Sequence, residues 1–291
     1  MRSFGSQRFT SYLFLAPYGL SFLVFIVAPI LVALSLAFTQ LDLTSRVPSH
    51  LVGLDNFSEA LHDPYFGQAA VATLRFTILI VPSLIVLAFG LAIGLQAMSF
   101  GRNAVRGLIF LPGMFNVVVA SLIWRWFYDG EFGLFNFLLK KVGLPHAPWL
   151  SDKSWAMPSI VAMSLWWGLG GATIILFAAL QQVPTHLYEA AMLDGATSRG
   201  LFANITLPQV RPVLLFVVVT STIGGFQLFG QSFILTSGGP ERSTTGLVML
   251  IYDTAFHKYR LGYASAISWL LFAMIAAFVL LQFFGLRRSV D

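Results

Sequence analysis

Long apolar runs separated by polar loops recur along the whole chain. An α-helix rises ~1.5 Å per residue, so crossing ~30 Å of hydrocarbon takes roughly 20 apolar residues. Six segments meet this requirement. We predict membrane-spanning helices, with boundaries accurate to about four residues, at residues 12–39, 72–98, 107–128, 158–181, 212–235 and 264–286. The expected fold class is an all-α integral membrane protein with six transmembrane helices.

Composition supports a membrane protein and narrows the chemistry. Of 291 residues, 57% are hydrophobic and only 10% are charged, whereas soluble proteins carry about 25% charged residues. No hydrophilic stretch could build a second core, so we expect residues 1–291 to form a single transmembrane domain. The chain has no cysteine, which excludes disulfides and cysteine-ligated metals. The net charge of +5 is scattered among short loops, which argues against nucleic-acid binding.

The basic residues predict the orientation of the chain. An even number of spans places both termini on one side, together with residues 99–106 and 182–211. That side holds eight arginines, namely Arg2, Arg8, Arg102, Arg106, Arg199, Arg211, Arg287 and Arg288. The opposite loops are longer and hold seven Lys or Arg, with nine of the twelve acids. The positive-inside rule therefore predicts that both termini are cytoplasmic.

The polar segment 184–212, between the fourth and fifth predicted spans, is patterned as a helix, a turn and a helix. Gly195 interrupts the first helix, because a residue without Cβ suits a sharp turn. A second short helix is expected to begin near Thr197, and Pro208 and Pro212 are expected to stop it. From these residues alone, an amphipathic hairpin resting on lipid headgroups explains the pattern equally well.

The same segment carries the triplet Glu189-Ala190-Ala191, then Asp194-Gly195-Ala196, and ends on Ile205, Leu207 and Pro208. This run resembles the EAA loop of binding-protein-dependent ABC importer permeases. In that family the loop forms a cytoplasmic coupling helix, which sits in a cleft of a separate ATPase subunit. The resemblance implies ATPase-coupling roles for Glu189, Ala190, Ala191, Asp194, Gly195 and Pro208.

Two further stretches are similar to carbohydrate-type members of that family. They are WRWFYDGEFGLFN at residues 124–136 and ILTSGGPERSTTGLVMLIYDTAF at residues 234–256. Such permeases import oligosaccharides, polyols and glycerol phosphates, so the resemblance implies a solute of this kind and half of its translocation pathway.

The resemblance also implies the partners and the location. The partners would be a second permease subunit, either a homologue in a heterodimer or a second copy of this chain, together with two copies of an ATPase, an extracytoplasmic solute-binding protein and the lipid bilayer. The location would be the cytoplasmic (inner) membrane of a prokaryote. ATP and Mg would bind the ATPase, and no cofactor is expected in this chain. A GxxxxGK[ST] phosphate loop is absent from the sequence, which agrees with a transporter subunit without its own ATPase site.

Other classes of function explain the sequence less well. An ion-coupled secondary transporter of a small polar solute would normally carry a membrane carboxylate, and all twelve acids lie outside the predicted spans. A membrane enzyme would need a motif such as HExxH or GxSxG, and neither occurs. A purely structural scaffold would leave the 184–212 segment unexplained.

A few polar and aromatic residues inside the predicted spans are candidates for the solute pathway. Gln227 and Gln231 are four residues apart and are predicted to face the same side of the fifth span. Amides and tryptophans suit the hydroxyl groups and CH faces of sugars, although they equally suit helix contacts and the membrane interface. The full candidate set is Asn116, Trp124, Arg125, Trp166, Gln227 and Gln231. Arg125 would favour an anionic solute if it faces the pathway, whereas snorkelling to the interface is the alternative.

Overall fold

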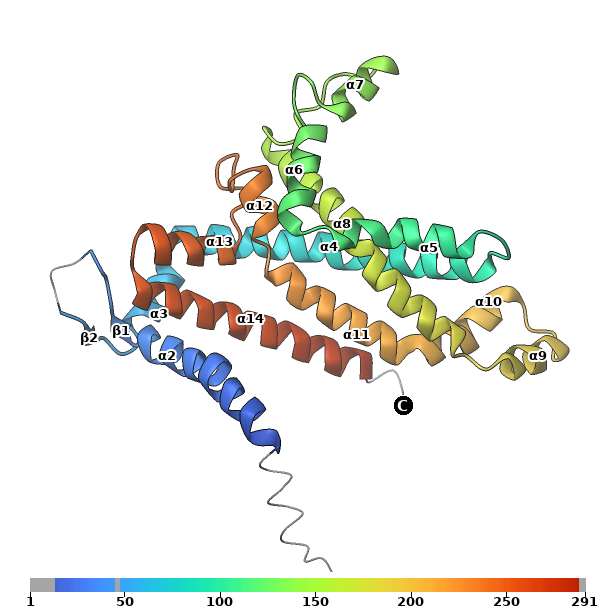
Figure 1. The fold of residues 1–291 in the computed structure, drawn as a ribbon, viewed down its shortest axis with the longest axis horizontal. Coiled ribbons are helices and arrows are strands. Elements are labelled where there is room, and N and C mark those ends of the chain that lie inside the picture. The colour runs from blue at the N-terminus through green and yellow to red at the C-terminus, as the bar shows by residue number, and fades with distance from the viewer. Residues whose placement is uncertain (1–13, 45–47, 288–291) are drawn as a thin grey trace, which may run out of the picture. The chain divides into compact units, whose positions relative to one another are not determined.

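The structure is a computed structural model that describes residues 14–44 and 48–287 (Figure 1). Three arginines used to predict the orientation, Arg2, Arg8 and Arg288, lie outside these residues, as do the first residues of the 12–39 span. The chain divides into two compact units, Met1–Asp63 with Ile251–Leu270, and Pro64–Leu250 with Leu271–Asp291. The single domain stays a prediction.

The first unit contains the first apolar helix, Phe14–Ala37, and the beginning of the last. Its elements are η1 (Leu23–Val27, a π-helical turn), α2 (Ala28–Ala37), β1 (Thr39–Gln40), β2 (His50–Leu51), α3 (Asp55–His62), η4 (Asp253–His257, a second π-helical turn) and the start of α14 (Leu261–Arg287). β1 and β2 pair antiparallel, and this small hairpin is an addition to the helices that the sequence predicts.

Polar contacts join the distant segments of this first unit. The Asn56 amide donates to the carbonyl oxygens of Ala37 and Thr39, both at 3.0 Å, and thereby satisfies the C-terminal end of the first apolar helix. Arg260 pairs with Glu59 at 2.7 Å, and the guanidinium pKa is raised chiefly by this hydrogen bond. α3 is therefore attached both to the end of the first helix and to the start of the last.

The second unit holds most of the chain. Its elements are α4 (Pro64–Ala97), α5 (Arg102–Phe110), η2 (Leu111–Met114, 3₁₀), α6 (Val117–Phe127), α7 (Leu134–Lys141), α8 (Lys153–Gln181), α9 (Thr185–Leu193), α10 (Ser198–Leu201), η3 (Phe202–Thr206, π-helical), α11 (Leu207–Phe226), α12 (Gly230–Leu235), most of α13 (Leu247–Tyr252) and the remainder of α14.

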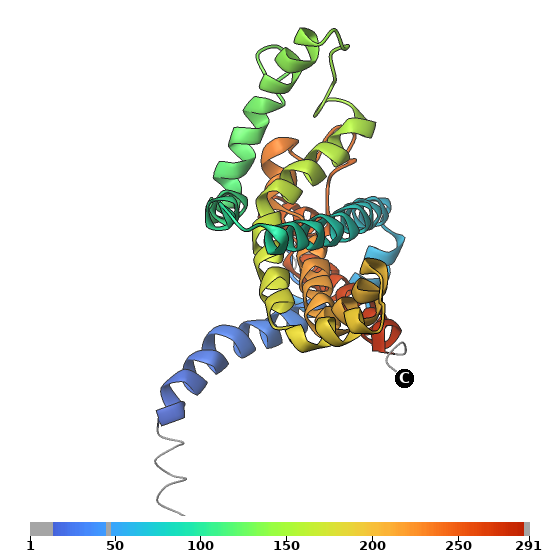
Figure 2. The same cartoon turned by 90° about the vertical axis from the view of Figure 1, so that its right-hand side faces the viewer.

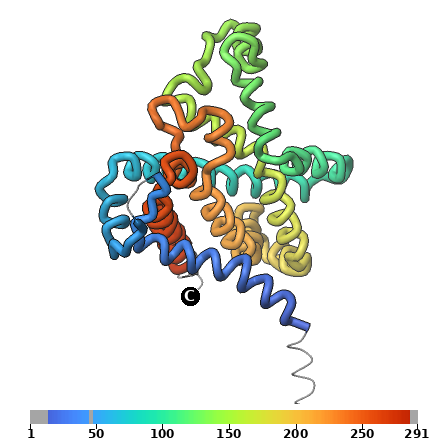
Figure 3. The backbone as a smooth tube through the Cα atoms, turned by 60° about the vertical axis from the view of Figure 1, so that its left-hand side comes forward, coloured from blue at the N-terminus to red at the C-terminus, as the bar shows by residue number. Residues whose placement is uncertain are grey.

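α4, α8 and α11 pack against one another and form the core of this unit. Figure 3 shows α8, in yellow, and α11, in orange, running side by side. Small residues allow close approach, because Ala88 and Ala92 of α4 are fully buried and a Cβ on Gly225 of α11 would lie 3.0 Å from Thr77 Oγ1. Close packing through small side chains is typical of helices in membranes.

The number of predicted spans agrees with the structure. Within residues 14–44 and 48–287, five helices are long and apolar enough to cross a membrane, and a bent pair of helices brings the number to six if the pair counts as one span. The five are Phe14–Ala37, Pro64–Ala97, Lys153–Gln181, Ser198–Phe226 and Leu261–Gly285. In the described chain, no Asp or Glu lies inside these helices or the bent pair.

The third span, predicted as one helix over 107–128, is broken. Arg102–Met114 and Val117–Phe127 meet at an angle of 99°. The chain tightens into η2 at the Pro112-Gly113 pair, and Asn116 then caps α6 by accepting from the N–H of Val118 at 2.9 Å. Figure 2 shows α6 and α7, in green, extending away from the α4, α8 and α11 group.

The fifth span, predicted at 212–235, is wrong at both ends. One helix runs from Ser198 to Phe226, so Pro208 and Pro212 lie inside it and do not stop it. The wide π-helical turn η3 immediately precedes α11, and such local rearrangements satisfy the backbone groups that a proline leaves free. The chain leaves the helix at Gln227 and forms a separate short helix, α12.

Candidate functional site

The predicted turn at Gly195 is present and has a defined geometry. α9 ends at Leu193, and Gly195 adopts a left-handed conformation with φ +80°. Its N–H donates to the Met192 carbonyl at 3.1 Å, and the N–H of Ala196 donates to the Ala191 carbonyl at 2.9 Å. This pair of bonds is the Schellman motif, which ends a helix most readily with glycine. The turn is therefore rigid and fixes the angle between α9 and the segment that follows it.

The segment after the turn begins as predicted but continues into the membrane helix. Thr197 caps α10 by accepting from the N–H of Gly200 at 3.3 Å. α10, η3 and α11 then follow without interruption. The segment that carries the EAA triplet is therefore one short helix, α9, joined by a rigid turn directly to the long helix Ser198–Phe226.

A polar contact joins the two arms of this turn. The Tyr188 hydroxyl on α9 and the Thr206 hydroxyl at the end of η3 lie 2.9 Å apart. Tyr188 and Ile205 also pack against the core formed by α4, α8 and α11. A force on α9 would therefore reach the core of the unit through packed side chains, without a flexible linker in between.

The residues assigned to ATPase coupling lie mostly on the outside of this unit. Glu189, Ala190, Asp194, Gly195 and Pro208 are exposed, and Ala191 is half-buried. Beside them, Leu193 is 90% exposed and Met192 is 55% exposed. α9 thus presents a short apolar tip with a carboxylate next to it.

The structure brings the tryptophans of the pathway set together. The rings of Trp124 and Trp166 lie 5.7 Å apart between centroids, and Trp124 also contacts Tyr128 and Phe135. Both tryptophans pack against a buried core cluster. The indole N–H of Trp124 is buried without a hydrogen-bond partner. Trp124 and Trp166 therefore build a packed aromatic group around one polar atom that lacks a partner.

The remaining pathway candidates do not meet at one place. Asn116 is the cap of α6, and Arg125 donates from Nη1 to the carbonyl of Ile234 in α12 at 3.3 Å. The expectation that Gln227 and Gln231 share one face of the fifth helix is wrong, because Gln227 follows the end of α11 and Gln231 belongs to α12. Gln227 is exposed and Gln231 is half-buried.

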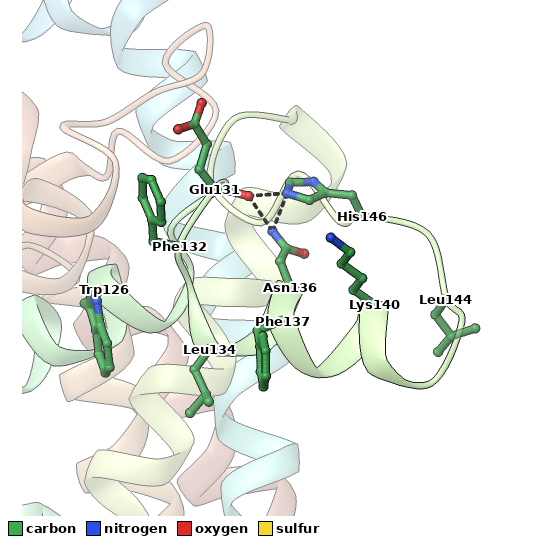
Figure 4. Close-up of a pocket in the computed structure, with 10 residues that line it drawn as sticks. Trp126, Glu131, Phe132, Leu134, Asn136, Phe137, Lys140, Leu144 and His146 are labelled. Carbon is green, nitrogen blue, oxygen red and sulfur yellow. Dashed lines mark hydrogen bonds between the residues drawn. The ribbon is translucent and has the colours of Figure 1, made fainter.

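The sequence analysis did not identify Asn136, whose side chain makes several hydrogen bonds to the loop before α8. Its amide is buried, donates to the Ala147 carbonyl at 3.2 Å, and accepts from the N–H of Ala147 at 3.0 Å and the indole N–H of Trp149 at 3.1 Å. Figure 4 shows Asn136 and His146 converging on the carbonyl oxygen of Gly130. Its position at the end of the 124–136 motif was the only signal in the sequence.

A cavity of about 720 Å³ opens beside Asn136. Its wall is largely apolar, with Trp126, Phe132 and Phe137 labelled in Figure 4. In the loop before α7, Asp129 accepts hydrogen bonds from the backbone N–H groups of Phe132 and Glu131, which lower the pKa of this carboxyl group.

Among the described residues, no group of three or more His, Asp or Glu side chains could hold a metal ion. The arrangement consists of apolar helices, a broken third span and a rigid helix-turn between the long helices Lys153–Gln181 and Ser198–Phe226. These features define a polytopic membrane protein.

Comparison with known proteins identifies the family. The chain belongs to the binding-protein-dependent transport system inner membrane components, whose family match covers residues 84–289. It is a permease subunit of an ABC importer, and the ion-coupled alternative is therefore excluded.

Several relatives have been described. The chain is 31% identical to the sulfoquinovosyl glycerol transport system permease protein SmoG of Agrobacterium fabrum, over 92% of this chain and 87% of the relative. It is 34% identical to the arabinooligosaccharides transport system permease protein AraP of Bacillus subtilis, over 94% and 87%. A bacterial alginate ABC transporter, solved in complex with an alginate pentasaccharide-bound periplasmic protein, contains a similar fold with a TM-score of 0.85, 23% identity and coverage of 98% and 96%.

Proposed function

We propose that this chain forms half of the translocation pathway for a carbohydrate or sugar-like solute, with a second permease subunit forming the other half. An extracytoplasmic binding protein delivers the solute, and two ATPase subunits, which hold the ATP and Mg, supply the energy. The chain itself contributes no ATPase site. It lies in a prokaryotic inner membrane with both termini and the α9 turn on the cytoplasmic side.

The observation that carries this proposal is the attachment of α9. In the proposed mechanism, the exposed Glu189, Ala190 and Leu193 enter a cleft of the ATPase. When the ATPase closes, α9 moves, and the Schellman turn and the Tyr188–Thr206 contact transmit the motion to α11 and the core. Asp194 lies at the C-terminal end of α9, and Pro208 lies in the first turn of α11, so the two residues mark the ends of the segment that transmits the motion.

The solute class is supported by the relatives and by the chemistry of the aromatic group. The relatives include permeases named for sulfoquinovosyl glycerol and for arabinooligosaccharides. Trp124 and Trp166 offer apolar faces that match the CH faces of sugars, while Asn116, Gln227 and Gln231 offer amides for hydroxyl groups. Arg125 is assigned to holding α12, through its bond to Ile234.

The test is ATP hydrolysis and solute uptake by the complex reconstituted with its ATPase and binding protein. Gly195→Ala forces a Cβ into the left-handed region, which costs ~1–2 kcal/mol and corresponds to roughly 5- to 30-fold in an equilibrium. We expect solute-stimulated hydrolysis to fall by about that factor, while the complex still assembles. Gly200→Ala is the matched control, since its added Cβ would meet its nearest neighbour, Thr197 Oγ1, at 3.6 Å, an ordinary contact.

Equal activity of the two variants would contradict the role of the turn. Uptake that follows a proton gradient and does not require ATP would contradict the proposed function as a whole.

A further inference from the structure

A second pocket, of about 470 Å³, lies in the second unit and contains an unusual number of charges. It is formed by one face of α4, the start of α8 and the loop after α12. Its lining residues are Gly67, Gln68, Val71, Ala72, Arg75, Lys153, Glu241, Arg242 and Ser243. The volume is in the usual range for small-molecule sites, which is about 300–1,000 Å³.

The charges in this pocket do not balance. Arg75, Lys153 and Arg242 supply three positive charges, and Glu241 supplies the one negative charge, so the net charge is +2 (3 − 1). Lys153 and Glu241 lie 3.4 Å apart, and their side chains are 61% and 78% exposed, so water screens this pair strongly. The pocket therefore has spare positive charge.

Arg75 is the least compensated of the three cations. It belongs to the long apolar helix α4. Crossing the membrane takes about 20 residues, and the central 20 residues of α4 include Arg75. Within the described chain its side chain makes no ion pair or hydrogen bond, although it lines the pocket. Ionisable residues in membrane helices usually face a partner, a cavity or a pathway, because the hydrocarbon excludes charge. The guanidinium of Arg75 is thus available to a ligand.

The opposite wall of the pocket is rigid. Thr244 is fully buried, donates to the Gly239 carbonyl at 2.8 Å and lies 2.7 Å from the Thr236 hydroxyl. Arg242 stacks over the Tyr65 ring, 4.3 Å from its centroid. The N–H of Leu247 donates to Thr73 Oγ1 at 2.9 Å, which fixes the end of the loop to α4. A rigid arrangement of cations lowers the cost of ordering them around an anion.

We propose that this pocket binds an acidic group of the transported solute, a carboxylate, sulfonate or phosphate, and that Arg75 is its main ligand. Guanidinium groups bind such oxyanions through two parallel hydrogen bonds. Gln68 and Ser243 lie beside the cations and suit the hydroxyl groups of an acidic sugar. The proposal rests on the function proposed above and narrows its solute class.

The test uses pairs of solutes that differ by an acidic group: cellobiose and cellobionate, trehalose and trehalose 6-phosphate, glycerol and glycerol 3-phosphate. ATP-dependent uptake is measured in phosphatidylcholine vesicles that contain the full complex and saturating binding protein. We expect the wild type to take up an acidic member, and Arg75→Gln to reduce that uptake by about tenfold or more, as for the loss of a charge-assisted hydrogen bond. Uptake of a neutral solute should change by less than about twofold, because such a solute has no acidic group that could lose a charge-assisted hydrogen bond to Arg75.

Two variants separate this role from a general effect of charge. Lys141→Gln removes an exposed cation at the end of α7, outside the pocket, and should leave both uptake rates unchanged. Arg75→Lys keeps the charge but loses the two parallel hydrogen bonds, and should retain part of the acidic uptake. Basal ATP hydrolysis and assembly of the complex show whether Arg75→Gln folds.

The outcomes are distinguishable. If the wild type transports only neutral members, or if Arg75→Gln lowers acidic and neutral uptake equally, the pocket assignment is overturned while the importer function stands. A loss that appears only in vesicles containing phosphatidylglycerol would assign the pocket to a lipid headgroup and would also overturn the proposal. If the wild type shows no ATP-dependent uptake of any member, the proposed solute class fails, and the pocket assignment falls with it.

Discussion

Asn136 shows how one side chain organises a segment of this protein. Its partners Ala147 and Trp149 follow it by 11 and 13 residues, on the far side of α7. All the hydrogen-bonding atoms of its amide side chain are used inside a largely apolar environment, where unpaired polar groups are costly. The residue therefore joins α7 to the loop between α7 and α8.

Replacing Asn136 with alanine should destabilise this segment. The N–H of Ala147 and the indole N–H of Trp149 would lose their acceptor, at a cost of ~1–3 kcal/mol for each buried group left without a partner. We expect a lower midpoint in thermal unfolding of the purified complex. Asn103→Ala, at an exposed position of α5, is the control, and it should change stability by less than about 0.5 kcal/mol. Equal midpoints for the two variants would refute the role of Asn136.

At the scale of elements, the main departures from the predicted helices occur at prolines. Two of the long helices contain a π-helical turn followed closely by a proline, at η1 before Pro29 and at η3 before Pro208. The helix continues in both cases, because the wider turn relieves the backbone that proline disturbs. A rule that ends a helix at proline therefore misplaced the fifth span.

The broken third span depends on how closely α5 approaches α8. A Cβ on Gly170 of α8 would lie 2.5 Å from the carbonyl oxygen of Ile109, which is too close for any side chain. Nearby, the indole N–H of Trp167 donates to the Phe115 carbonyl at 2.9 Å, at the break itself. α8 thus supports both the end of α5 and the beginning of α6.

Gly170→Ala and Gly171→Ala should have opposite effects on stability. The first forces α5 away from α8, as in an overpacked core, at a cost of ~1–3 kcal/mol. The second adds a Cβ that meets nothing within 4 Å, and it should be neutral or stabilise the helix by up to ~1 kcal/mol. Thermal unfolding of the two variants measures the difference. Similar midpoints would mean that α5 does not pack this closely on α8 in the membrane.

At the scale of the whole molecule, the six-span count implies that alternate loops lie on opposite sides of the membrane. Because the chain has no cysteine, any cysteine introduced is unique. Ser198 lies after the α9 turn, and Ser151 precedes α8; both are exposed. These two positions therefore report on the two sides.

We expect Ser198→Cys to react with a membrane-impermeant maleimide only after the cytoplasmic face is made accessible, and Ser151→Cys to react in intact cells. The measurement is labelling of intact cells against inverted vesicles, with the cysteine-free wild type as control. Labelling of both positions from one side would contradict a membrane crossing by α8, and the reversed labelling pattern would contradict the predicted orientation.

The sequence by itself determined the features that depend on neighbouring residues. Apolar runs are local, so they predicted the number of spans, and the EAA triplet with Gly195 predicted the helix and turn of residues 185–197, because a left-handed glycine ends a helix through bonds within the same few residues.

Tertiary structure decided what depends on residues far apart in the chain. The break before α6 is supported by α8, and the turn after α9 is fixed by the Tyr188–Thr206 contact. Arg75 shares a pocket with Lys153 and Arg242, which are more than seventy residues away. No local pattern encodes such neighbours, because packing between helices determines which side chains share a cavity and which remain without a partner.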